Sequence, residues 1–146
     1  MAITTNAIAN SFKKELLEAK HNFTQTSGDQ FKLALYTSSA TLGKSTTSFT
    51  TDHQVANTGQ YTSGGGKLAK GSQQTSVASS VAIVDFADRS FTGVTLTARG
   101  ALIYNTSNSN TAVAVLDFGG DKTATAGTFT IQFPAFTTSA AILRIS

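Results

Sequence analysis

The sequence predicts a mainly β protein, a single antiparallel β-sandwich or barrel-like domain with one N-terminal α-helix. Short apolar runs recur in the C-terminal half between clusters of Gly, Asn, Asp and Ser, which is typical of antiparallel strands joined by turns. Thr and Ser supply 40 of the 146 residues, and the branched Thr side chain favours strands that are half exposed to water. A chain of this length suits one domain, so we expect residues 1–146 to form a single unit.

The N-terminal segment predicts a helix over residues 6–20. Its apolar side chains recur at three- or four-residue intervals: Ile8, Phe12, Leu16, Ala19 and Phe23. Thr5 or Asn6 can cap the first turn, and Lys14 lies four residues before Glu18, which favours an ion pair. Two roles are open for this helix: it covers an open end of the sheet, or it docks as an arm on a neighbouring subunit.

Residues 31–37 predict the first strand, because Phe31, Leu33 and Leu35 alternate with residues that point to the other face. The stretch 37–70 is a long irregular excursion rich in Ser, Thr and Gly. Its sizeable apolar side chains are few: Phe49, Val55, Tyr61 and Leu68. A loop of this length is uncommon in a compact domain. Either it contains short irregular strands, or it becomes ordered against a partner.

Regular antiparallel strands are expected over residues 73–145. We place them near 75–86, 91–105, 111–119, 127–133 and 140–145. Residues 85–90, 105–110 and 119–127 are expected to be hairpin connections, because Asn, Asp, Ser and Gly tolerate turn geometry.

Composition and charge argue against several functional classes. The formal net charge is +3, but the cations are scattered, whereas a nucleic-acid-binding protein gathers them on one face. No apolar run is long enough to span a membrane, and we expect neither a membrane partner nor a signal peptide. The chain has no cysteine, so disulfides and thiolate metal sites are excluded.

No motif predicts catalysis, a cofactor or a metal ion. The SGGGK run at 63–67 lacks the spacing of a phosphate-binding loop, and a Leu stands where that loop needs Ser or Thr. The pairs Asp85/Asp88 and Asp117/Asp121 are too sparse for calcium, and turn hydrogen bonds explain them equally well. The sequence has no Gly-x-Ser-x-Gly motif that would present a nucleophilic serine to either of its two histidines. Its only two glutamates lie on the predicted helix, which leaves few candidates for a catalytic carboxylate pair. We therefore expect a protein that is not an enzyme.

Four segments resemble small virion proteins of tailed bacteriophages. They read FKLALYTSSATL (31–42), ARGALIYN (98–105), AVLDFGGDK (114–122) and GTFTIQFP (127–134), and the likeness spans roughly residues 31–145. Members carry an acidic residue and a GTGYT turn where this chain reads QVANTGQYT at 54–62. The resemblance implies a virion structural protein, with the major capsid protein or tail proteins and copies of its own chain as partners.

Within that class, we expect a capsid decoration or cement protein that assembles as a homo-oligomer on the virion. The predicted partner-contact residues are Ile8, Phe12, Leu16, Phe49 and Tyr61, which are the apolar side chains of the helix and of the excursion. A tail accessory protein, such as an appendage or fibre-adaptor subunit, is one alternative. The other is a lectin-like module that binds host glycans, with Tyr36, Tyr61 and Tyr104 as stacking platforms.

Overall fold

A computed structural model describes residues 3–69 and 74–146. The prediction of a mainly β, antiparallel fold with one N-terminal helix is confirmed, with 45% strand and 6% helix. The elements follow in the order β1 (Ala7–Ile8), α1 (Asn10–Leu17), β2 (Phe31–Tyr36), β3 (Gly66–Lys67), β4 (Gln74–Ala78), β5 (Val81–Asp85), β6 (Arg89–Asn105), β7 (Thr111–Ile131) and β8 (Leu143–Ile145). The two sheets formed by the described residues are sandwich-like, and they do not close into a barrel.

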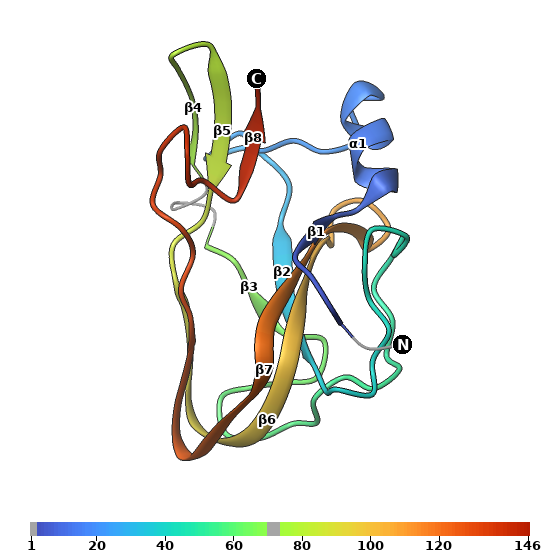
Figure 1. The fold of residues 1–146 in the computed structure, drawn as a ribbon, viewed down its shortest axis with the longest axis vertical. Helices are drawn as coiled ribbons and strands as arrows, with labels where there is room; N and C mark the ends of the chain where they lie inside the picture. Colours follow the sequence, from blue (N-terminus) through green and yellow to red (C-terminus); the bar gives the residue numbers. More distant parts are fainter. Residues whose placement is uncertain (1–2, 70–73) are drawn as a thin grey trace.

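The larger sheet has the strand order β1-β7-β6-β2-β3, and its centre is the long β6–β7 hairpin. The two strands pair from Arg89↔Ile131 to Asn105↔Thr111, so residues 106–110 form the connection, as expected. Figure 1 shows this hairpin bending at the end of the molecule opposite the small sheet, so that its far half runs back toward that sheet.

The expected hairpin at 119–127 is wrong, because β7 continues through it as one strand. The register of β6 against β7 shifts between Ala98↔Lys122 and Gly100↔Asp117, so extra residues of β7 bulge out opposite Arg99. Gly119 takes a φ of 78° in this bulge, a conformation that glycine adopts at little cost. The glycine signal therefore marks a bulge instead of a turn.

The smaller sheet has the order β4-β5-β8. The single strand expected over 75–86 is instead a β4–β5 hairpin, which pairs Gln74↔Asp85 through Ala78↔Val81. Ser79 and Ser80 both have positive φ values, 50° and 65°, as a tight two-residue hairpin turn requires. β8 pairs with the other side of β5, from Ala82↔Ile145 to Val84↔Leu143.

The helix is shorter than the predicted span 6–20, because its first residues pair with the sheet instead. Ala7 and Ile8 form β1 opposite Val115 and Ala114. The N-cap is Ala9, without a side-chain hydrogen bond, so neither Thr5 nor Asn6 caps the helix. The expected pair between Lys14 and Glu18 is present.

Residues 37–69 are ordered against the chain's own sheet. The segment contains β3 and the isolated bridges Tyr36↔Gln54, Ser48↔Thr111 and Thr58↔Tyr61. Gly65 lies so close to β2 that an added Cβ would be 1.9 Å from the Leu33 carbonyl oxygen, which gives the glycine run a packing role. Of the excursion expected over 37–70, residue 70 lies outside the described residues, as does the expected start of the regular strands at residue 73.

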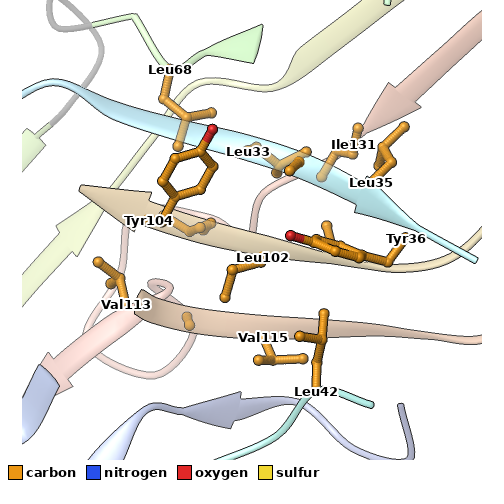
Figure 2. Packing of buried hydrophobic residues seen from close by; sticks show 14 of the residues in the cluster. Leu33, Leu35, Tyr36, Leu42, Leu68, Leu102, Tyr104, Val113, Val115 and Ile131 are labelled. Carbon is orange, nitrogen blue, oxygen red and sulfur yellow. The ribbon is translucent and has the colours of Figure 1, made fainter. Parts of the chain in front are cut away.

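The core lies where β2, β6 and β7 meet the excursion (Figure 2). Leu33, Leu35, Leu102 and Tyr36 are each fully buried. Because both faces of β2 are covered, this strand is apolar on both faces, as buried strands are.

Candidate functional site

An apolar groove of about 300 Å³ lies between α1 and the small sheet. Its apolar lining comes from both sides: Ile8, Phe12, Leu16 and Phe23 from the helical side, and Ala82, Val84, Leu143 and Ile145 from the sheet. Lys13 and Arg144 also contribute to the lining. Arg144 lies between Leu143 and Ile145 on β8, so its side chain points to the opposite face of that strand. We call this apolar groove the α1–β8 groove.

The sheet wall follows from strand geometry. Ala82 is opposite Ile145, and Val84 is opposite Leu143, so these four side chains share one face of the β5–β8 pair. That face is not fully covered by the chain itself, because Ile145 keeps 61% of its surface exposed.

The opposite wall is fixed by the packing of the helix on the core. Phe12 is 2% exposed, and its ring meets the rings of His21 and Phe23 at centroid distances of 4.7 and 6.0 Å. Leu16 is half-buried against the same core. Thus the inner side of α1 packs into the core, and the side next to it forms one wall of the groove.

A buried polar network holds the end of this helix. His21 Nε2 lies 2.6 Å from Glu15 Oε2, and His21 Nδ1 lies 3.0 Å from Asn105 Nδ2. Asn105 Nδ2 also donates to Asp29 Oδ2 at 2.7 Å, while Ser107 N donates to Asn105 Oδ1 at 3.0 Å. Because these contacts link α1 to the end of β6, they keep the helical wall in place.

The charge around the groove is positive. Lys14 and Lys20 both pair with Glu18, and their ammonium groups lower the pKa of Glu18 to about 2. Among the residues that the structure describes, no carboxylate lies within ion-pair distance of Lys13 or Arg144. Arg144 Nη1 instead donates to the Ser139 carbonyl oxygen at 2.8 Å. Two cations at the groove therefore lack an anionic partner in this part of the chain.

Exposed apolar side chains gather at the same end of the molecule. Leu17 is 92% exposed, Val77 71% and Ile145 61%. They belong to α1, β4 and β8, which Figure 1 places together at one end. Exposed apolar surface beside an apolar groove is typical of an interaction site.

A second cleft, of about 480 Å³, lies beside the β7 bulge and is lined by Phe118, Phe129 and Phe133. Its acidic group is already engaged within the chain. Asp117 Oδ1 accepts hydrogen bonds from Gly119 N and from Arg99, and these two donors lower the pKa of Asp117. The Asp117 carboxylate of this cleft is therefore already engaged within the chain, although Asn6, Lys122 and Gln132 also line it.

The predicted partner-contact residues separate into two sets. Ile8, Phe12 and Leu16 meet in the α1–β8 groove. Phe49 lies elsewhere, half-buried and stacked on Tyr104 at a centroid distance of 4.7 Å. Tyr61 is 1% exposed and packs edge-on against Phe91, so neither of these two adds to the groove.

The three tyrosines fasten the excursion to the sheet. Tyr36 Oη donates to the Thr50 carbonyl at 2.6 Å, Tyr104 Oη donates to the Gly64 carbonyl, and Tyr61 Oη accepts from Leu35 N at 2.8 Å. Burial raises the pKa of Tyr61 to about 12. Because all three rings are at most 3% exposed, they offer no surface platform on which a glycan could stack.

The sheet wall and the two cations were missed by sequence reasoning. One signal was available: residues 81–86 carry apolar side chains on both faces of a strand, so a second covering layer is needed. The sequence did not reveal this, because the serines at 79 and 80 gave no clear turn signal and residues 75–86 were therefore predicted as one strand.

Comparisons with known proteins give no relative for this chain: no family model, curated protein or solved structure matches it. Within the described ranges 3–69 and 74–146, no group of three or more His, Cys, Asp or Glu side chains could hold a metal ion. The only helix described, α1, is too short to cross a membrane.

Proposed function

We propose that this chain is a non-enzymatic structural protein of a tailed-bacteriophage particle, and that it decorates the capsid by binding other virion proteins. The observation that carries the proposal is the α1–β8 groove, an apolar surface at one end of a β-body with two cations that have no carboxylate partner among residues 3–69 and 74–146. The likeness of four segments to small phage virion proteins supports the same class.

A cement protein needs a body that does not deform and a surface that binds its neighbours. The three buried tyrosine contacts support the first requirement, because they tie residues 50–64 to β2 and β6. The excursion is thus part of the body, and the α1 end is the favoured contact surface. Many copies on one particle would reduce the affinity that each contact must supply.

Quantitative mass spectrometry of purified particles from the parent phage tests this proposal. We expect the chain at a copy number close to that of the major capsid protein. A copy number of a few hundredths of that value would replace decoration with the tail accessory alternative. Absence of the chain from the particles would overturn the virion function altogether.

A further inference from the structure

We propose that the α1–β8 groove binds an extended segment of another protein, rich in alternating apolar and acidic residues, which adds a strand to the free edge of β8. This inference rests on the proposed function and names how a neighbouring virion protein would be held. Within the part of the chain that the structure describes, three properties of the groove carry it: a strand edge without a neighbour, an apolar trough beside that edge, and two cations without a carboxylate partner.

The strand edge supplies the backbone contacts. Among the described residues, β8 pairs only with β5, so one side of Leu143–Ile145 has no strand of this part of the chain beside it. That free side faces α1 across the groove (Figure 1). An unpaired edge offers N–H and C=O groups to an incoming chain, and strand addition is a common way to bind extended peptides.

The trough supplies apolar contacts. In an added strand, every second side chain points to the face that already carries Leu143 and Ile145. Phe12 and Leu16 close the other side of this space. The groove volume of about 300 Å³ suits a few aliphatic side chains, so apolar residues at alternate positions fit the site.

Charge selects the remaining side chains of the partner. Lys13 and Arg144 line the groove without a carboxylate partner among residues 3–69 and 74–146. In an added strand, the side chains between the apolar ones point to the face of β8 that carries Arg144, so acidic residues at those positions would compensate this cation, while Lys13 adds positive charge at the groove. Complementary charge speeds association and rejects wrong partners.

The same charge disfavours a second copy of this chain as the occupant. A symmetric antiparallel pairing of two β8 strands places the central residue of one opposite its equivalent, and that residue is Arg144. Like charges directly opposite each other destabilise a strand pair. An acidic segment meets no such repulsion.

The test measures the binding of two labelled, end-blocked peptides to the full chain by fluorescence anisotropy. One peptide alternates leucine with glutamate, and the other alternates leucine with lysine. We expect the glutamate peptide to bind and the lysine peptide to bind at least about tenfold more weakly. Hydrogen exchange at the amides of residues 143–145 should slow when the glutamate peptide binds, because strand addition engages that edge.

Charge-reversal variants make the test specific. Lys13→Glu combined with Arg144→Glu should weaken the glutamate peptide about tenfold and strengthen the lysine peptide. Both side chains are exposed, so we expect the fold to survive, and circular dichroism verifies this. Lys67→Glu, an exposed cation on β3 outside the groove, is the matched control and should leave both affinities unchanged.

Three results would overturn the inference: no binding of the glutamate peptide, equal binding of both peptides, or affinities that the double reversal leaves unchanged. Self-association of the chain with protection of residues 143–145 would also overturn it, because a second copy would then be the occupant. Particle mass spectrometry separates this failure from failure of the proposed function. A chain abundant in particles but unable to bind the peptide retains its virion function and loses only this binding mode.

Discussion

At the scale of single residues, the fold depends on polar atoms placed inside an apolar core. The hydroxyl of Tyr61 lies in the interior, where it accepts the hydrogen bond of the Leu35 amide. A buried amide without an acceptor costs far more than the same amide in water. The hydrogen bond of Tyr61 therefore connects the excursion to β2.

The first prediction concerns the hydrogen bond of Tyr61 at alkaline pH. Burial raises the pKa of Tyr61 from its ordinary value of 10.0 to about 12, so the unfolded chain loses its phenolic proton at a lower pH than the folded chain does. The stability contributed by the protonated ring is complete below pH 10.0 and is lost as pH rises towards 12. Urea unfolding at neutral pH and near pH 11 should show this loss, with tyrosinate absorbance following the unfolding transition.

Tyr61→Phe separates the two roles of the hydroxyl. At neutral pH the variant should be destabilised by about 1–3 kcal/mol, since the Leu35 amide loses its acceptor. Between neutral and alkaline pH it should lose less stability than the parent chain. Some loss should persist, because burial also raises the pKa of Tyr36. An unchanged pH dependence in the variant would contradict the buried, protonated state of Tyr61.

At the scale of elements, the sequence located most strands but not how they are joined. Apolar runs predicted β2, β6 and β8, because strand residues identify themselves through composition and alternation. Glycine and serine were misread in two places. In residues 119–127 the glycines mark a bulge within β7, while Ser79 and Ser80 form a turn with positive φ that serine seldom adopts. The same residue types serve bulges and turns, so composition alone does not distinguish them.

The second prediction tests the bulge in β7. Gly119 has a φ of 78°, whereas its neighbour Gly120 does not have a positive φ. An added Cβ would meet nothing within 4 Å at either position. Gly119→Ala should therefore cost about 1–2 kcal/mol of unfolding free energy from backbone strain alone.

Gly120→Ala is the matched control, with the same side chain added one residue away. It should be neutral or stabilise the protein by up to about 1 kcal/mol, because alanine restricts the unfolded chain. Urea unfolding of both variants measures the difference. Equal effects at the two positions would contradict the left-handed conformation of Gly119, and with it the continuous β7.

At the scale of the whole molecule, the candidate site could be only half predicted. Ile8, Phe12 and Leu16 stand at helical spacing, so a local pattern identifies them. The other wall comes from residues 82–84 and 143–145, which are brought to the helix by the pairing of β5 with β8. No local pattern encodes that approach. It depends on which strands pair, and pairing is decided by the fold as a whole.

The third prediction concerns the N-terminal segment, for which the sequence left two roles open. Deleting residues 1–22 would remove Ile3, Ala9 and Phe12 from the core, where they are 0%, 0% and 2% exposed. The deletion would also remove β1 from the edge of β7, and His21 from its contact with Asn105. We expect the deletion to lower the free energy of unfolding by more than about 5 kcal/mol. This approaches the whole stability of a typical domain, so the truncated chain should lack a cooperative thermal transition.

Leu17→Ser provides the comparison, because Leu17 belongs to the same helix but is 92% exposed. It should change the free energy of unfolding by no more than about 0.5 kcal/mol and leave the chain with a cooperative thermal transition. It also removes apolar surface at the end of the molecule that carries the groove. Circular dichroism on heating measures both variants. A truncated chain that melts as cooperatively as the parent would show that the helix is a detachable arm. Loss of the transition, together with an unaffected Leu17→Ser, would mean that α1 is built into the core on its inner side and exposes surface for a partner on its outer side.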